Sequence, residues 1–99
     1  MVELTGKQRR HLRALGQRLA ATVQAGHDGV TDALVAQVAA QLEALELVKV
    51  RVSENAPETR HATAEALAQR THAHLAQVLG RTVLLYRARK EAPAIVLPS

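Results

Sequence analysis

The segment Leu47–Val52, which reads LVKVRV, constrains the fold of this chain more than any other feature. Its three valines occupy alternate positions and share one face of a strand, while Lys49 and Arg51 point to the other face. Segments with helical spacing of apolar residues come before and after it. Strands that are separated by helices run parallel through right-handed crossovers. The alternation therefore predicts an α/β protein whose sheet is covered by helices.

Capping and turn residues predict the other elements. Thr5 with Gln8 three residues later has the form of a capping box, and Thr31 and Asn55 are good N-caps. Gly80 with the next residue suits a two-residue hairpin turn. The order αβαβαββ then gives a four-stranded mixed sheet with three helices. We expect helices over residues 5–19, 31–45 and 55–70, and strands over residues 20–25, 47–52, 73–79 and 82–87.

The composition excludes several classes of protein. The chain has 99 residues, of which 47% are apolar, but Tyr86 is its only aromatic residue, so Leu, Val and Ala must build the core. It has no Cys, which excludes disulfides and thiolate metal sites. No apolar run approaches the roughly 18 residues of a membrane span, and residues 1–7 lack the apolar stretch of a signal peptide. We therefore expect a cytoplasmic protein with no membrane partner.

Positive charge is concentrated near the two ends of the chain. Residues 1–19 hold five cations and one acid, and residues 80–90 hold four cations and no acid. Residues 26–66 hold seven acids and three cations. A fold that brings the two basic blocks together would form a patch that binds polyphosphate. Two separate solvated faces are the alternative.

A Gly-x-x-Gly loop precedes the second predicted helix. Gly26 and Gly29 let the backbone turn sharply and approach another molecule closely. The helix start that follows offers unpaired N–H groups and the positive end of the helix dipole, which together can seat a phosphate. KH domains bind nucleic acid with a loop of this form. Two glycines at this spacing are more often a simple turn, and Asp28 and Asp32 oppose an anion.

Five segments carry a resemblance to a known family. They read LTGKQRR from residue 4, LRAL from residue 12, GHDGVT from residue 26, ELVKVR from residue 46 and QVLGRTVLLYR from residue 77. Over residues 4 to about 90 the chain resembles the YhbY family, stand-alone members of the CRM (chloroplast RNA splicing and ribosome maturation) RNA-binding domains. The resemblance implies a fold like the C-terminal domain of translation initiation factor three. It also implies association with precursor large ribosomal subunits, and hence with ribosomal RNA.

The resemblance also predicts the domain boundaries, and the chain departs from the family pattern at several positions. It implies one RNA-binding domain over residues 1–90, followed by an irregular tail over residues 91–99. His27 stands where the family often has a basic or small residue, and His72 stands where a glycine is expected at the end of the third helix. Residues 17–21 replace a His-x-Leu-x-Pro stretch.

The predicted RNA contacts are the cations of the basic segments and the glycine-loop residues. They are Lys7, Arg9, Arg10, Arg13, Gly26, His27, Gly29, Lys49, Arg51, Arg81 and Arg87. Tyr86 could stack on an unpaired base or lie in the core. His72 and His74 give too few ligands for zinc, so we expect no metal and no cofactor. No nucleophile–base set surrounds Ser53, so we expect no enzyme and no small-molecule substrate.

Two other functions remain open at this stage. A small, basic chain without cysteine could be an architectural DNA-binding protein, although neither a long β-arm nor a basic recognition helix is evident. A module that docks to a ribosomal protein is the other alternative, using the open face of the sheet and the acidic middle segment. We expect the protein to be a monomer.

Overall fold

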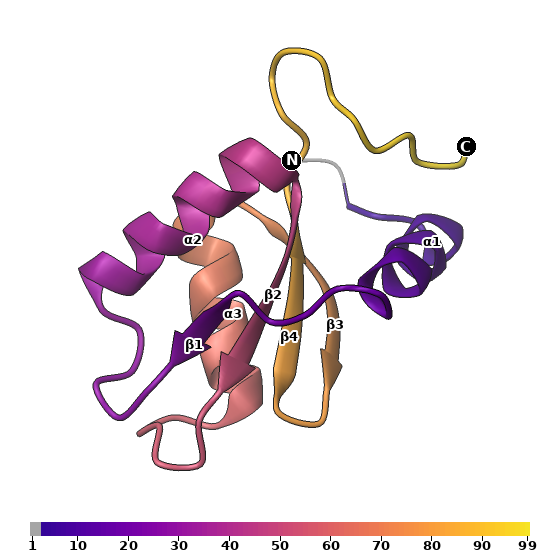
Figure 1. Ribbon diagram of the computed structural model, residues 1–99. Coiled ribbons are helices and arrows are strands. Elements are labelled where there is room, and N and C mark those ends of the chain that lie inside the picture. Colours follow the sequence, from indigo (N-terminus) through magenta and orange to yellow (C-terminus); the bar gives the residue numbers. More distant parts are fainter. Residues whose placement is uncertain (1–2) are drawn as a thin grey trace.

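The computed structural model describes residues 3–99 as three helices and four strands, in the αβαβαββ order that the sequence predicts (Figure 1). The elements are α1 (Gly6–Gly16), β1 (Val23–Ala25), α2 (Asp32–Leu45), β2 (Leu47–Val52), α3 (Arg60–Thr71), β3 (His74–Leu79) and β4 (Thr82–Tyr86). None of the helices within residues 3–99 has the length and apolar character needed to cross a membrane.

The strands form one mixed sheet in the order β1-β2-β4-β3. β1 and β2 are parallel, with Val23 opposite Val50, and β4 is antiparallel to both β2 and β3. The crossover through α3 makes β2 and β3 parallel, as expected. They are not neighbours, however, because β4 returns between them from the hairpin turn, where Gly80 has a φ of 55°. The predicted mixed sheet is confirmed, whereas the order of its strands was not predicted from the sequence.

Helices cover both faces of the sheet (Figure 1). On one face, Val48, Val50 and Val52 of β2 pack with buried residues of α2 and α3 to form the main core. On the other face, Leu12 of α1 packs with Leu84 and other buried residues of the sheet in a smaller core. The alternation of LVKVRV therefore places the valines as predicted.

The start of α3 differs from the expectation. The helix begins at Arg60 with Thr59 as its N-cap, and the prediction of an N-cap at Asn55 is wrong. Pro57 explains the difference, because the residue before a proline is disfavoured in helical conformation, and Ala56 occupies that position. The segment before Thr59 is therefore a loop at the end of β2.

Other boundaries are shorter than expected. α1 ends at Gly16 and not at Leu19, and β1 covers three residues in place of six. Residues 17–22 instead connect α1 on one face to β1 at the far edge of the sheet (Figure 1). β3 and β4 match the predicted strands to within one residue at one end each.

The C-terminal tail has no helix or strand over residues 88–99, but it is packed against the protein. Ile95 and Leu97 lie against the smaller core beside Leu12 and Tyr86. Gln8 Nε2 donates a hydrogen bond of 3.1 Å to a carbonyl oxygen near the end of the tail. The tail thus covers the α1 face together with α1.

Candidate nucleic-acid interface

α1 presents a set of cations whose positions follow from how the helix is capped and packed. Thr5 and Gln8 form the predicted capping box, with Gln8 N–H donating to Thr5 Oγ1 at 3.1 Å and Thr5 N–H donating to Gln8 Oε1 at 3.0 Å. Leu12 and Gly16 are buried against the sheet. Lys7 and Arg10 are consequently exposed on the other side of the helix, and Arg9 and Arg13 are half-exposed on its flank.

These α1 cations are not balanced by acids. Within residues 3–99, no carboxylate forms an ion pair with Lys7, Arg9, Arg10 or Arg13. The sequence has no Asp or Glu at all over residues 4–27. Moreover, cations in the first turn of a helix oppose the helix dipole, so Lys7 does not serve the stability of α1. The arrangement fits a surface that binds an anionic partner.

The two predicted cations of β2 extend this surface across the sheet. Arg51 is exposed and Lys49 is half-buried, and both alternate along β2 with the valines of the main core, so they lie on the face of the sheet that carries α1. Lys49 Nζ donates to the carbonyl oxygen of Leu19 at 3.0 Å, so it also holds the connection that follows α1. Arg18, which is exposed two residues after the end of α1, adds a further cation. We define the α1 surface as Lys7, Arg9, Arg10, Arg13, Arg18, Lys49 and Arg51.

The Gly-x-x-Gly loop is shaped as predicted. Gly29 has a φ of 72°, a conformation that favours glycine, and its N–H donates to the carbonyl oxygen of Gly26 at 3.0 Å. A hydrogen bond of 3.1 Å from Leu34 N–H to Thr31 Oγ1 caps α2 directly after the loop. The loop, including His27, lines a pocket of about 240 Å³.

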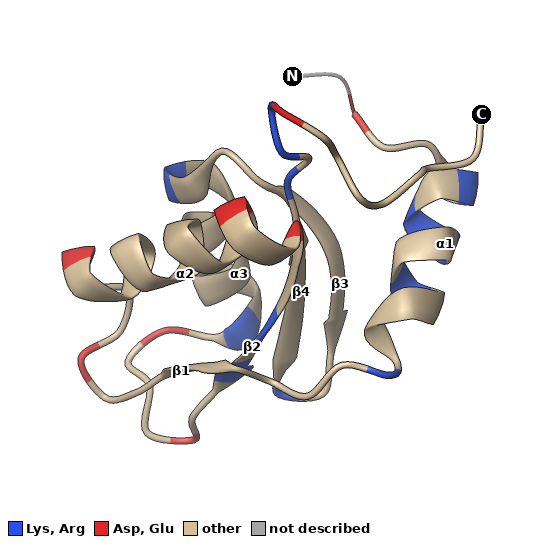
Figure 2. Ribbon diagram, turned by 45° about the horizontal axis from the view of Figure 1, so that its top comes forward, with Lys and Arg blue, Asp and Glu red and all other residues tan. Residues whose placement is uncertain are grey.

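The acids near the loop have partners of their own. Asp28 lies 3.2 Å from His27 Nε2, and Asp32 pairs with Arg70 of α3. The charge of Arg70 reduces the repulsion that Asp32 would exert on a phosphate. Figures 1 and 2 place the loop beyond β1, at the opposite side of the sheet from α1. The α1 surface and the loop are therefore two separate groups of predicted contact residues and not one continuous patch.

The two predicted arginines of the last hairpin have different environments. Arg81 is 46% exposed at the side chain, with its Nε 3.8 Å from Glu54, so it can reach solvent. Arg87 is half-buried, and its guanidinium donates hydrogen bonds of 2.6 Å to the carbonyl oxygen of Thr71 and 3.2 Å to that of Ala39. Its guanidinium also pairs with Glu43. Arg87 thus ties α2 and α3 to the end of β4.

The aromatic and histidine residues lie mainly in structural positions. Tyr86 is buried and its ring stacks on His74, with ring centroids 6.2 Å apart. Of the two predicted roles, Tyr86 therefore lies in the core and does not stack on a base. Burial and the charge of Arg9 lower the pKa of His74, which is therefore neutral near pH 7. His72 ends α3 at a φ of 57°, which explains why a glycine is expected there. No group of three metal-ligating side chains occurs in the described part of the chain.

Glu46 is a buried residue that the sequence did not reveal. It is fully buried between α2 and β2 at a φ of 65°. Its carboxylate accepts N–H hydrogen bonds from Arg89 (2.8 Å), Ala94 (2.7 Å) and Ile95 (2.9 Å) of the tail. Burial alone would raise the pKa of Glu46, but these hydrogen bonds and the charge of Arg89 outweigh it and hold the pKa below its ordinary value. No local pattern marks a Glu between two Leu residues as an anchor.

Comparison with known proteins identifies relatives over nearly the whole chain. The model of the CRS1/YhbY (CRM) domain matches residues 4–87. The chain is 43% identical over 95 residues to "Probable RNA-binding protein YqeI" of Bacillus subtilis, covering 96% of this chain and 99% of that protein. It is 33% identical over 92 residues to "RNA-binding protein" of Haemophilus influenzae, covering 93% of each. The solution structure of SAV1595 from Staphylococcus aureus superposes with a TM-score of 0.82 at 38% identity, over 96% of this chain and 99% of that one.

Proposed function

The chain belongs to the CRS1/YhbY (CRM) domain family, and we propose that it binds structured RNA through the α1 surface without catalysing a reaction on it. The observation that carries this proposal is the set of α1 cations with which no carboxylate within residues 3–99 forms an ion pair. Phosphate groups of RNA supply the missing negative charge. Relatives whose names describe RNA-binding proteins support the same partner.

The two groups of contact residues have separate tasks in this proposal. The α1 surface neutralises several phosphates, which provides most of the binding free energy and makes it sensitive to salt. The loop at Gly26–Gly29 brings its backbone against one further phosphate at the start of α2. Contacts of both kinds recognise the shape and backbone of a folded RNA more than its sequence. Arg81 at the hairpin is available as an additional contact.

The finer proposal is that this RNA is ribosomal RNA in an assembling large ribosomal subunit. It rests on the resemblance of residues 4–90 to the YhbY family, which implies association with precursor large subunits. The absence of aromatic residues other than the buried Tyr86 agrees with binding to folded RNA, because an extended single strand is usually held by several stacked aromatic side chains.

Crosslinking in cells followed by sequencing of the bound RNA tests both levels. We expect large-subunit ribosomal RNA to be enriched over background with the wild-type chain, and the enrichment to be lost when Lys7 and Arg10 are both changed to Glu. Enrichment of other RNA alone would contradict the ribosomal proposal. If duplex DNA competes as well as folded RNA at fixed salt, the chain is a general nucleic-acid binder and the RNA proposal fails.

A further inference from the structure

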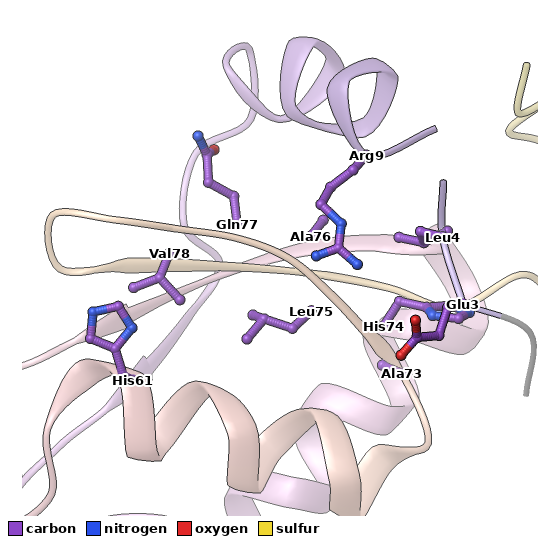
Figure 3. Close-up of a pocket in the computed structure, with 10 residues that line it drawn as sticks. All are labelled: Glu3, Leu4, Arg9, His61, Ala73, His74, Leu75, Ala76, Gln77 and Val78. Carbon is purple, nitrogen blue, oxygen red and sulfur yellow. The ribbon is translucent and has the colours of Figure 1, made fainter. Parts of the chain in front are cut away.

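β3 is one of the two outer strands of the sheet, and its free edge lies in a groove between α1 and α3 (Figure 3). The groove has a volume of about 590 Å³, which is within the range of pockets that hold small ligands. Residues 73–78 line it along nearly the whole strand. An outer strand also presents backbone N–H and C=O groups that no neighbouring strand uses.

The side chains around the groove combine apolar and hydrogen-bonding groups. Figure 3 shows Arg9 reaching in from α1 and His61 standing opposite on α3, with Leu75 and Val78 on the α3 side of the strand. Leu75 and Val78 are half-buried, and they offer apolar surface to the face of a base. Arg9, His61 and the amide of Gln77 can stack on a base or bond its edges.

Arg9 makes the groove continuous with the α1 surface. Its side chain is half-exposed and belongs to both. An RNA whose phosphates contact Arg9 as well as the more exposed Lys7 and Arg10 would pass beside the open edge of β3. Glu3 and Arg9 are the charged groups among the residues that line the groove, and the further cations of α1 make its α1 side net positive, which attracts a phosphodiester.

The irregularity of β3 argues against a peptide as the occupant. Leu75 pairs with Leu85 and Gln77 pairs with Leu84, so Ala76 is an extra residue that forms a β-bulge. A peptide that adds to a sheet needs a regular run of outward N–H and C=O groups, and a bulge twists the edge away from such pairing. A base needs only one or two of these groups, so the bulge does not prevent it from binding.

We propose that the β3 groove seats an unpaired nucleotide of the RNA that the α1 surface holds, an inference that rests on the proposed function. Phosphates on α1 anchor the RNA, and a base that leaves its helix enters between Arg9 and His61. The protein would then prefer folded RNA with a loop or bulge over a continuous duplex.

Amide NMR spectra of the ¹⁵N-labelled full chain test this placement. The probes are a hairpin RNA with an unpaired uridine loop and a blunt RNA duplex with the same stem. We expect the amide signals of residues 73–78 to shift with the hairpin and to remain unchanged with the duplex. Signals of α1 should shift with both, because both RNAs offer phosphates.

Variants of the groove provide a second readout. His61→Ala combined with Gln77→Ala should reduce the preference for the hairpin over the duplex by about fivefold, since a stacked base contributes on this scale. Gln69→Ala, an exposed change on α3 outside the groove, is the matched control and should leave the preference unchanged. The α1 variant Arg10→Ala should weaken both RNAs equally.

The outcomes separate this inference from the proposed function. If α1 signals shift while residues 73–78 do not, and the groove variants keep the preference, the groove is overturned and RNA binding stands. If neither RNA binds, the proposed function fails. If a peptide of alternating valine and glutamate shifts the signals of residues 73–78 and the hairpin does not, the groove takes a peptide and the inference is wrong.

Discussion

Lys7 occupies a position where stability and binding make opposite demands. It is the second residue of α1, directly after Gly6, and its side chain is exposed. The N-terminus of a helix carries partial positive charge, so a cation there is unfavourable and an anion is favourable. If the α1 surface binds RNA, the same cation contributes to affinity. Changing Lys7 to Glu should therefore stabilise the protein and weaken RNA binding at once.

The change in stability and the change in RNA affinity both have an expected size. Removing the cation and adding an anion in the first turn should raise the free energy of unfolding by about 1 kcal/mol, and the new carboxylate would face Arg10 and His11 at favourable helical spacing. For a domain of this size, that raises the melting temperature by about 4–8 °C. Losing one phosphate contact lowers the salt slope by about 0.9, which corresponds to about eightfold weaker binding at 0.1 M salt.

Thermal unfolding and RNA titrations over a range of salt concentrations measure the two effects on the same sample. Arg60→Glu is the matched control, because Arg60 opens α3 on the other side of the sheet and also lies in a first turn without acids. It removes the same amount of charge and should also raise the melting temperature, but it should leave the salt slope nearly unchanged. Equal loss of affinity in both variants would show that only net charge matters, and it would refute the assignment of binding to α1.

Four further substitutions test other parts of the structure. Glu46→Gln should lower the free energy of unfolding by about 2 kcal/mol at pH 7, because it weakens buried hydrogen bonds to a charged acceptor. Since the pKa of Glu46 is lowered by folding, its contribution is fully present above pH 4.5 and is lost progressively as the pH falls from 4.5 through the lower pKa of the folded state; the urea unfolding curves of wild type and variant should therefore approach each other only at pH values below that folded pKa. Gly29→Ala should destabilise the fold by about 1 kcal/mol because of its positive φ, whereas Gly26→Ala has open space around its new methyl group and should weaken only RNA binding, as thermal unfolding and titration would show. Gly16→Ala places a methyl carbon 2.6 Å from Leu84, so calorimetry should show a loss of about 1–2 kcal/mol from overpacking.

Local patterns predicted much of the fold because the forces that act there are local. The period of two in LVKVRV assigns the faces of β2 from the sequence alone, since strand geometry fixes which residues share a face. Thr5 and Thr31 cap their helices through hydrogen bonds to residues only three positions away. The position of β4 between β2 and β3 depends instead on contacts between distant segments, and no local pattern encodes it.

The candidate site shows the same division. The exposure of Lys7 and Arg10 follows from the burial of Leu12 on the other side of α1, which helical periodicity already indicates. The environment of Arg87 does not follow from the sequence, because its partners Thr71 and Ala39 are 16 and 48 residues away. As RNA contacts, all of the predicted residues stay predictions.

The main core on one face of the sheet is larger than the core under α1 on the other face. This difference explains how the chain can keep its fold although the cations at the start of α1 destabilise that helix. The main core joins β2 to α2 and α3, so the unfavourable charge at the start of α1 falls on an element outside it. α1 is held instead by Leu12, by the close approach of Gly16 to Leu84, and by the tail that Glu46 anchors. Because the tail and α1 share the smaller core, loosening Glu46 should reduce RNA affinity even though Glu46 touches no part of the α1 surface.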